Sequence, residues 1–269
     1  MYLQHWGLRN RPFDPSADAR FFYPADSQQA ALLKLRYVVE NRQGLAVIVG
    51  ESGLGKSYAL AYLLRQLPER FEPRLQIAFP KLSLEGFLSY LSAELTGEEG
   101  AASLPAAAAL RRLEVTLREG AQAGRHCVVV VDDAHLLIDS PVLTGLRLLT
   151  NLTHEGLPMI TFLLAAQPDF LPALQRWNDL NDRVAARCLL KRFDLAQTTS
   201  YIRHRIVAAG GEPELFTATA VATIHEHAQG IPRRINRLGD LALLIGYAEE
   251  HQQIDAEQIE AVVDEMILA

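Results

Sequence analysis

The chain has 269 residues, of which 49% are hydrophobic and 22% are charged, and its formal net charge at pH 7 is −6. This length suits one large domain, or a large domain with a smaller one, and the composition is that of an ordinary globular protein. The acidic balance argues against a generally basic nucleic-acid coat but leaves room for a local basic face.

The start of the chain carries polar groups and prolines in place of a basic-then-apolar signal. No apolar run approaches the roughly 18 residues needed to cross a bilayer. The two cysteines, Cys127 and Cys188, lie in apolar stretches and are expected to be free buried thiols, which is consistent with a reducing compartment. We therefore expect a cytoplasmic protein with no direct membrane insertion.

Strands and helices are expected to alternate as far as residue 193. Apolar runs rich in strand-forming residues predict strands at 45–49, 75–79, 127–131, 160–165 and 187–190. Leucine-rich stripes at 60–67 and 84–91 have the i, i+3, i+4, i+7 spacing of a helix, and the alanine-rich stretch 103–110 is expected to be helix or loop. Such alternation indicates an α/β fold, with a parallel sheet covered by helices on both faces.

After residue 193 the strand signal disappears and four helical segments follow. Asp194 and Asp255 each stand three residues before a glutamine, as in a capping box. Thr217 is placed to cap the second segment, and Pro232 suits a first helical turn. We therefore predict an α/β body at 45–193 and a small all-helical lid domain at 194–269.

The segment Gly50–Ser57 reads G-E-S-G-L-G-K-S and lies between a predicted strand and a predicted helix. It fits the pattern GxxxxGK[ST], in which glycines let backbone N–H groups turn toward phosphate oxygens and a helix amino terminus adds partial positive charge. Lys56 is expected to reach the β- and γ-phosphates of ATP, and Ser57 to place its hydroxyl on Mg²⁺. The predicted nucleotide-binding residues are Gly50, Glu51, Ser52, Gly53, Leu54, Gly55, Lys56 and Ser57.

Four consecutive valines at 128–131 end in two aspartates. In proteins with such a loop, an acidic residue at the end of a later strand holds Mg²⁺ through water. Asp132 is expected to take that role, the alternative being an aspartate that merely caps the strand end.

With these motifs in hand, the chain resembles AAA+ ATPases of the ExeA (general secretion pathway protein A, GspA) type, which are related to MshM-like pilus-biogenesis and TnsC/TniB-like transposition ATPases. The resemblance covers nearly the whole chain and is most specific in the amino-terminal run from YLQHWGLRNRPF to the loop at 50–57, where Trp6 replaces the usual phenylalanine. It implies a nucleotide-proximal segment at 1–44, with Phe13 near the adenine.

The same resemblance implies three further roles. Gln167 matches the polar sensor near the γ-phosphate or the attacking water, and Arg233 matches the sensor arginine of the helical domain. Arg183 matches the arginine finger offered to a neighbouring subunit, with Arg187 as its competitor, so a homo-oligomer, either ring or filament, is also implied. From the residues alone, Gln167 could instead cap the turn that follows it, and the arginines could be solvated surface charge.

Relatives that hydrolyse ATP well usually have glutamate where this chain has Asp133. We predict that Asp133 orients the attacking water and that its shorter reach makes turnover slow, because misplacing a catalytic group by about 1 Å costs on the order of 10²-fold in rate. A nucleotide-held switch with negligible hydrolysis is the alternative. His135 is either structural or a relay near the nucleotide.

The expected function is therefore a Mg-ATP-dependent ATPase that drives assembly-linked conformational change in secretion or pilus biogenesis, with a membrane-embedded partner possible. The competing function is an ATPase that assembles on duplex DNA and regulates a transposase-like partner. Its candidate phosphate contacts are Lys191, Arg192, Arg203, Arg205, Arg234 and Arg237.

Overall fold

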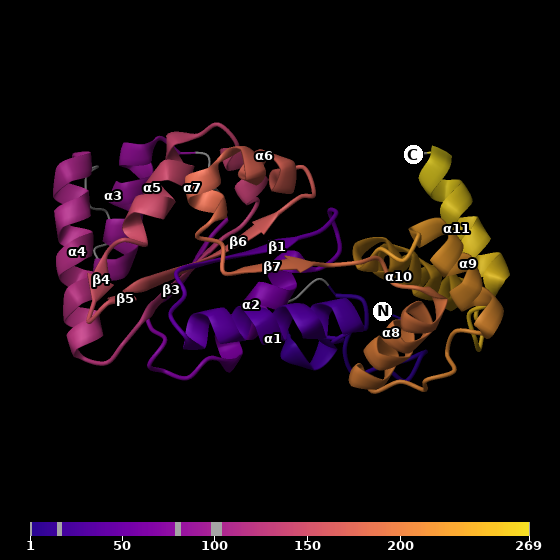
Figure 1. Ribbon diagram of the computed structural model, residues 1–269. Coiled ribbons are helices and arrows are strands. Elements are labelled where there is room, and N and C mark those ends of the chain that lie inside the picture. The colour runs from indigo at the N-terminus through magenta and orange to yellow at the C-terminus, as the bar shows by residue number, and fades with distance from the viewer. Residues whose placement is uncertain (1, 15–17, 79–81, 98–103, 269) are drawn as a thin grey trace. The chain divides into compact units, whose positions relative to one another are not determined.

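The computed structural model describes residues 2–14, 18–78, 82–97 and 104–268 (Figure 1). These residues form two units. The α/β unit comprises Gln28–Glu51 and Ala59–Leu190, and the helical unit comprises Met1–Ser27, Ser52–Tyr58 and Lys191–Ala269. The division into parts at 1–44, 45–193 and 194–269 stays a prediction.

In the described part of the α/β unit, five parallel strands form one sheet in the order β2-β3-β6-β1-β7. Their bounds are Arg74–Ile77 (β2), Cys127–Val131 (β3), Ile160–Ala166 (β6), Leu45–Val49 (β1) and Ala186–Leu189 (β7). The ranges predicted for β1 and β3 are confirmed to the residue, and β6 ends one residue later than predicted. Strand β7 is shifted by one residue, so that it begins and ends one residue earlier than predicted. The predicted range 75–79 ends at Phe79, which lies outside the described residues.

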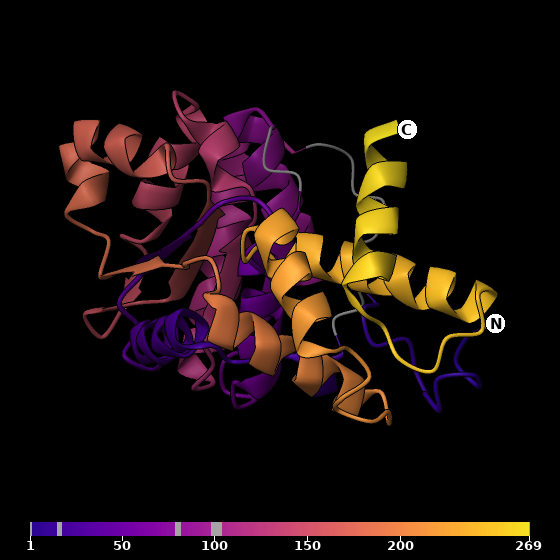
Figure 2. The same cartoon turned by 90° about the vertical axis from the view of Figure 1, so that its right-hand side faces the viewer.

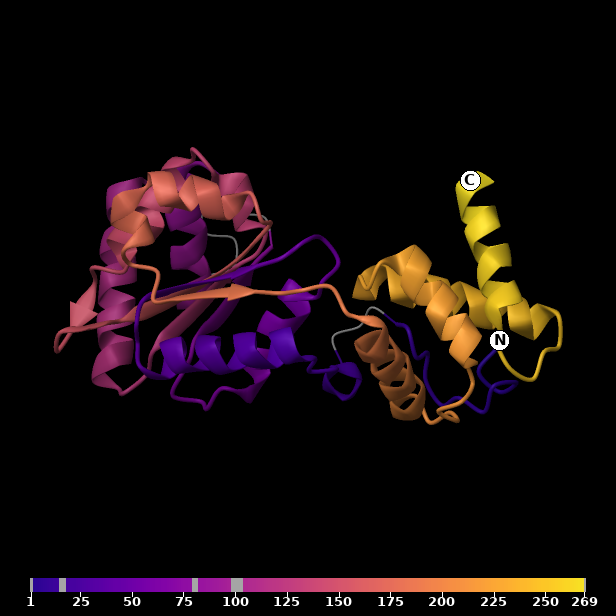
Figure 3. The ribbon, with the colours of Figure 1, turned by 45° about the vertical axis from the view of Figure 1, so that its right-hand side comes forward.

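Helices cover both faces of this sheet (Figures 1 and 3). One face carries α1 (Asp26–Glu40) and α2 (Lys56–Gln66), and the other carries α3 (Leu84–Thr96), α4 (Ala106–Gln122), α5 (Pro141–Leu149), α6 (Phe170–Arg176) and α7 (Asn178–Asn181). Because neither face meets water, every residue of β1, β3 and β6 is buried, which explains the continuous apolar runs in the sequence.

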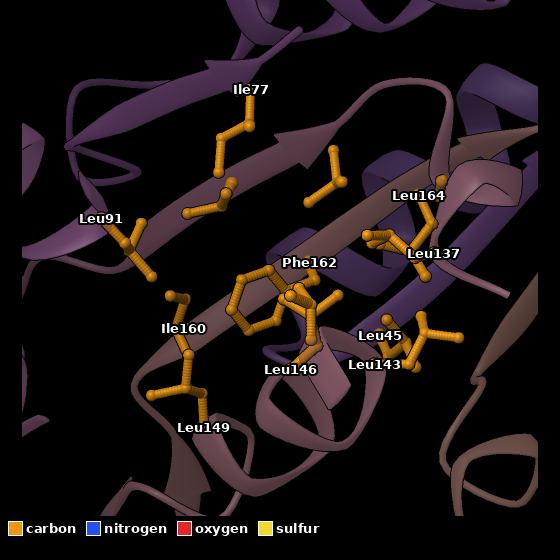
Figure 4. Close-up of a cluster of buried hydrophobic side chains, with 14 of the residues drawn as sticks. Leu45, Ile77, Leu91, Leu137, Leu143, Leu146, Leu149, Ile160, Phe162 and Leu164 are labelled. Atoms are coloured by element: carbon orange, nitrogen blue, oxygen red, sulfur yellow. The ribbon is translucent and has the colours of Figure 1, made fainter. Parts of the chain in front are cut away.

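The larger core lies between the sheet and α3–α6 (Figure 4). Phe162 of β6 is fully buried at its centre, beside Leu146 of α5. Burial of a side chain of this size contributes roughly 1.5–3 kcal/mol. This packing holds β6, and with it β1 and β3, in a fixed register.

One hairpin was not predicted. Strands β4 (Thr153–His154) and β5 (Leu157–Pro158) pair antiparallel around Glu155 and Gly156, whose φ angles are +50° and +80°. Positive φ at both turn residues is the conformation that favours a two-residue hairpin. Two-residue strands are too short to leave a periodic signal in the sequence.

The helical unit contains the four predicted carboxyl-terminal helices, α8 (Leu195–Ala208), α9 (Ala218–Ala228), α10 (Pro232–Ala248) and α11 (Ala256–Leu268) (Figure 2). The capping box at Asp194 is confirmed, as is the Thr217 cap, which accepts from the backbone N–H of Ala220. The second predicted capping box is only half formed. The Gln258 side chain accepts from the Asp255 backbone, but the Asp255 carboxylate accepts from the N–H of Ala256 and the Thr217 hydroxyl.

The amino-terminal segment packs into the same unit. Trp6 donates its indole N–H to the carbonyl of Leu243 at 2.9 Å, a hydrogen bond that phenylalanine could not form. No helix in the described ranges is both long and apolar enough to span a membrane.

Arg205 corrects one sequence-based expectation. Its side chain was a candidate phosphate contact, but the residue is 2% exposed. Its guanidinium donates to the carbonyls of Pro12, Asp14 and Phe21, all in the helical unit. Arg205 therefore anchors the amino-terminal segment and is not free to bind a nucleic acid.

Candidate functional site

The predicted phosphate-binding motif starts where β1 ends. The backbone N–H of Gly50 donates to the carbonyl of Ala166, the last residue of β6, at 3.2 Å. The motif continues into the helical unit through Ser52 and ends at Lys56 and Ser57, the first residues of α2. The predicted order of strand, loop and helix is therefore the observed order.

Two glycines give this loop its shape. Gly53 and Gly55 have φ angles of +87° and +89°, a region that side chains other than glycine rarely adopt. A Cβ at Gly53 would also lie 2.9 Å from the Cβ of Arg233 and 3.0 Å from Cγ2 of Ile231. Glycine is therefore required at position 53 both by the backbone and by the helix packed against it.

The amino terminus of α10 lies directly on this loop. The backbone N–H of Arg233 donates to the carbonyl of Gly53 at 3.2 Å, and its Nη1 donates to the hydroxyl of Ser52 at 3.3 Å. Pro232 occupies the first turn of α10 as predicted. Arg233, a predicted site residue, therefore contacts the loop. Its side chain remains largely exposed.

The acidic pair follows β3. The backbone N–H of Asp132 donates to the carbonyl of Ile77 at 2.9 Å, and an Asp132 carboxylate oxygen accepts from the N–H of Asp133 at 3.0 Å. Asp133 has a left-handed backbone conformation, φ 48° and ψ 38°, and precedes the short helix η2 (Ala134–Leu137). Its side chain is 54% exposed, so its carboxylate is accessible to solvent.

Gln167 comes directly after β6, and its amide nitrogen lies 3.0 Å from Nε2 of His135. The other ring nitrogen of His135 lies 3.9 Å from a carboxylate oxygen of Asp133. The contact between His135 and Gln167 joins residues 32 positions apart in the chain, and no sequence pattern predicts it.

Strand register brings these residues to one edge of the sheet. Val49 pairs with Ala166, and Val131 pairs with Leu164. Gly50, Gln167 and Asp132 therefore follow the carboxyl ends of three adjacent strands. Neighbouring strands lie about 4.8 Å apart, so β1 and β3, on either side of β6, are separated by about 10 Å.

The two candidate finger arginines do not lie at this edge. Ala185 donates its N–H to the carbonyl of Leu45, which places Arg183 near the amino end of β1. Its Nη1 donates to the hydroxyl of Thr150 at 3.2 Å. Arg187 pairs with Val47 halfway along the strands, and its guanidinium donates to the backbone and side-chain oxygens of Asn181.

Phe13, the predicted adenine neighbour, is 3% exposed in the core of the helical unit. Its ring meets that of Phe216 edge-on at 5.8 Å and covers Gly239 of α10. Little of its surface remains for a ligand, and its predicted contact with adenine stays a prediction.

Comparison with known proteins assigns the chain to a family. Residues 39–174, just over half of the chain, match the family described as AAA domain. The chain belongs to that AAA family. General secretion pathway protein A of Aeromonas hydrophila is 32% identical over 262 residues, which cover 94% of this chain and 46% of that protein. The present AAA chain thus spans about half the length of this relative, and the predicted ExeA/GspA-type resemblance is confirmed.

Solved structures share the fold of this AAA protein. The Aeropyrum pernix ORC1 protein in complex with DNA has a TM-score of 0.73 and 16% identity, with 96% of this chain and 70% of that chain covered. The Aeropyrum pernix ORC2 protein in its ADPNP-ADP complexes has a TM-score of 0.71 and 17% identity, with 95% and 71% covered. At these identities the likeness confirms the predicted α/β fold with a helical carboxyl-terminal part, and nothing about ligands.

Proposed function

We propose that the chain binds Mg-ATP at Gly50–Ser57 and hydrolyses it. The observation that carries this proposal is the single sheet edge at which β1, β6 and β3 end, because it gathers the start of the phosphate loop, a polar amide and an acidic pair. Ligands of open α/β sheets bind outside the carboxyl ends of the strands.

Ser57 and Asp132 are proposed as the protein ligands of a magnesium ion. The hydroxyl of Ser57 and the carboxylate of Asp132 are oxygen donors, the ligand class that Mg²⁺ prefers, and few protein ligands suffice because the ion keeps several waters. Magnesium, when bound, neutralises charge on the β- and γ-phosphate oxygens. Lys56 adds a fixed positive charge, and it is 7% exposed at the start of α2, where the helix dipole also favours an anion.

Asp133 is proposed to orient the attacking water. Its exposed carboxylate and its position one residue after Asp132 support this role. The side chain is one methylene shorter than glutamate, so we expect slow hydrolysis that assembly or a partner accelerates. Gln167 is proposed to touch the γ-phosphate or the same water.

Arg233 is proposed to report the state of the loop to α10. Its contacts with Ser52 and Gly53 support this, since a nucleotide on the loop offers phosphate oxygens that compete for the same guanidinium. A change at Arg233 would move α10, which begins at the preceding residue. The work done by hydrolysis would then start with a shift of α10.

The pathway is proposed from the relative. The Aeromonas hydrophila protein is named for the general secretion pathway, and we propose that this chain serves secretion or pilus biogenesis in the cytoplasm, as a homo-oligomer with a membrane-embedded partner.

The experiment that tests ATP binding and hydrolysis compares wild type with Lys56→Ala and Asp133→Glu. Lys56→Ala is expected to weaken ATP affinity at least tenfold, as measured with a fluorescent ATP analogue, because it removes a charge-assisted contact to phosphate. Asp133→Glu is expected to keep that affinity and to accelerate single-turnover hydrolysis by roughly tenfold to a hundredfold. Unchanged affinity in Lys56→Ala would refute the site. If Asp133→Glu were no faster than wild type in any assembled state, the length of the Asp133 side chain would not limit the hydrolysis rate.

A further inference from the structure

Three polar side chains form a line at the carboxyl edge of the sheet. The His135 ring lies between Gln167, 3.0 Å from its Nε2, and Asp133, 3.9 Å from its Nδ1. The His135 side chain is 13% exposed, and its Nδ1 is buried without a hydrogen-bond partner among the described residues. A buried polar atom without a hydrogen-bond partner lowers the stability of the folded state, so its presence needs an explanation.

The surroundings of the ring select one tautomer. If Nδ1 carries the proton, Nε2 accepts from the Gln167 amide nitrogen and the Nδ1–H dipole faces the Asp133 carboxylate. The opposite tautomer would require the Gln167 amide to turn its oxygen toward Nε2–H. It would also point the lone pair of Nδ1 at a negative charge, which is repulsive. The Nδ1–H tautomer is therefore favoured.

The tautomer in turn fixes the Gln167 amide. One amide N–H is committed to His135, which leaves the amide oxygen free to accept a hydrogen bond from a water and the second N–H free to donate to a phosphate oxygen. A glutamine held this way presents its acceptor and its donor in a defined arrangement, whereas a free amide samples both.

Asp133 completes the line. Its left-handed backbone is uncommon for a residue other than glycine, although aspartate adopts it more readily than most. The gap of 3.9 Å to Nδ1 exceeds a hydrogen bond by about 1 Å. If the Asp133 carboxylate moved about 1 Å closer, it could accept a hydrogen bond from the buried Nδ1–H of His135.

We propose that His135 is a positioning residue for ATP hydrolysis, which couples the orientation of the Gln167 amide to the placement of the Asp133 carboxylate through its Nδ1–H tautomer. The proposal rests on the proposed hydrolysis at this site. It assigns His135 no contact with ATP, so its loss should slow hydrolysis without weakening nucleotide binding.

The tautomer is tested directly by ¹⁵N NMR of the full chain labelled at histidine, without nucleotide, with the His135 signals identified by their loss in His135→Gln. We expect a protonated Nδ1 and an unprotonated Nε2 in wild type. In Gln167→Leu, which removes the amide donor, we expect the proton to populate Nε2. A wild-type ring protonated at Nε2 would overturn the proposal.

The kinetic test uses His135→Leu, which fills similar space without nitrogen atoms, and His135→Asn, which retains an N–H near the position of Nδ1. We expect His135→Leu to slow single-turnover hydrolysis roughly tenfold to a hundredfold, as losses of orienting partners do. ATP affinity should stay within about twofold, because His135 makes no proposed contact with ATP. His135→Asn should recover part of the rate. Melting curves confirm that each variant is folded.

A double variant separates positioning from packing. If His135 acts in part through Gln167, the loss of rate in His135→Leu combined with Gln167→Leu should be smaller than the product of the two single losses, because both changes remove the same contact between the two side chains. Multiplicative losses, or an affinity that falls with the rate, would overturn the proposal. Absence of hydrolysis by wild type in every assembled state would refute the proposed activity, whereas the wrong tautomer beside normal hydrolysis would refute only the role of His135.

Discussion

His126 shows how one residue can set the pH response of the α/β unit. It is 1% exposed, its Nε2 lies 2.8 Å from the Thr161 hydroxyl, and its Nδ1 has no hydrogen-bond partner among the described residues. Burial, with a smaller contribution from the positive charge of Arg42, lowers the pKa of His126 from 6.5 to about 4. The ring is thus neutral in the folded protein under conditions in which the unfolded chain is protonated.

The sign of the effect on stability follows from this shift. Between about pH 6.5 and pH 4 the unfolded state binds more protons at this residue, so the free energy of unfolding falls as the pH falls. The contribution is fully present above pH 6.5, and its loss at low pH is on the order of 3 kcal/mol. We expect urea unfolding of His126→Gln to show a weaker loss of stability than wild type between pH 7 and pH 4.5. Parallel pH profiles for the two proteins would contradict this assignment.

At the scale of a structural element, one buried charge on α8, that of Arg205, holds the amino-terminal segment. The Arg205 guanidinium donates to carbonyls of the amino-terminal segment and stacks on the Phe21 ring at 4.8 Å. Arg205→Met keeps most of the volume but leaves carbonyls unpaired, so we expect a loss of about 2–4 kcal/mol in the free energy of unfolding. Faster proteolysis within residues 2–14 should accompany it.

Arg203 supplies the matched control on the same helix. It forms an exposed ion pair with Glu214 at 2.7 Å, and such pairs contribute about 0–1 kcal/mol. Arg203→Met should therefore unfold at nearly the wild-type urea concentration. Equal losses in the two variants would show that the buried contacts of Arg205 do not hold the segment.

Elements with a strong local signal could be predicted from sequence. The valine run of β3 and the capping box of α8 are determined by residues close in the chain, and both formed as predicted. The burial of Arg205 also has a local signal, since it follows Tyr201 by four positions and shares its buried face. The contact between His135 and Gln167 had none, because it depends on the pairing of β3 with β6.

At the scale of the whole molecule, the position of Arg183 restricts the nucleotide that it could reach. It lies near the amino end of β1, whereas the phosphate loop follows the carboxyl end, and a five-residue strand spans about 16 Å. An arginine at that edge of the sheet is poorly placed to reach a phosphate at the opposite edge of its own sheet. If Arg183 serves as an arginine finger, the nucleotide it stabilises must belong to a neighbouring copy.

Mixing two inactive variants tests this arrangement. Arg183→Ala should lose about a thousandfold or more in hydrolysis rate, the usual contribution of an arginine finger, and Asp133→Ala should be inactive for lack of a water-orienting carboxylate. A mixture should regain activity, because Asp133→Ala subunits still donate Arg183 to sites that retain Asp133. A matched mixture of Arg187→Ala with Asp133→Ala decides between the two arginines. Only the variant that removes the arginine finger should be inactive alone and active in the mixture. Activity lost in Arg183→Ala and not recovered in any mixture would mean that this arginine acts within its own subunit, through its bond to Thr150.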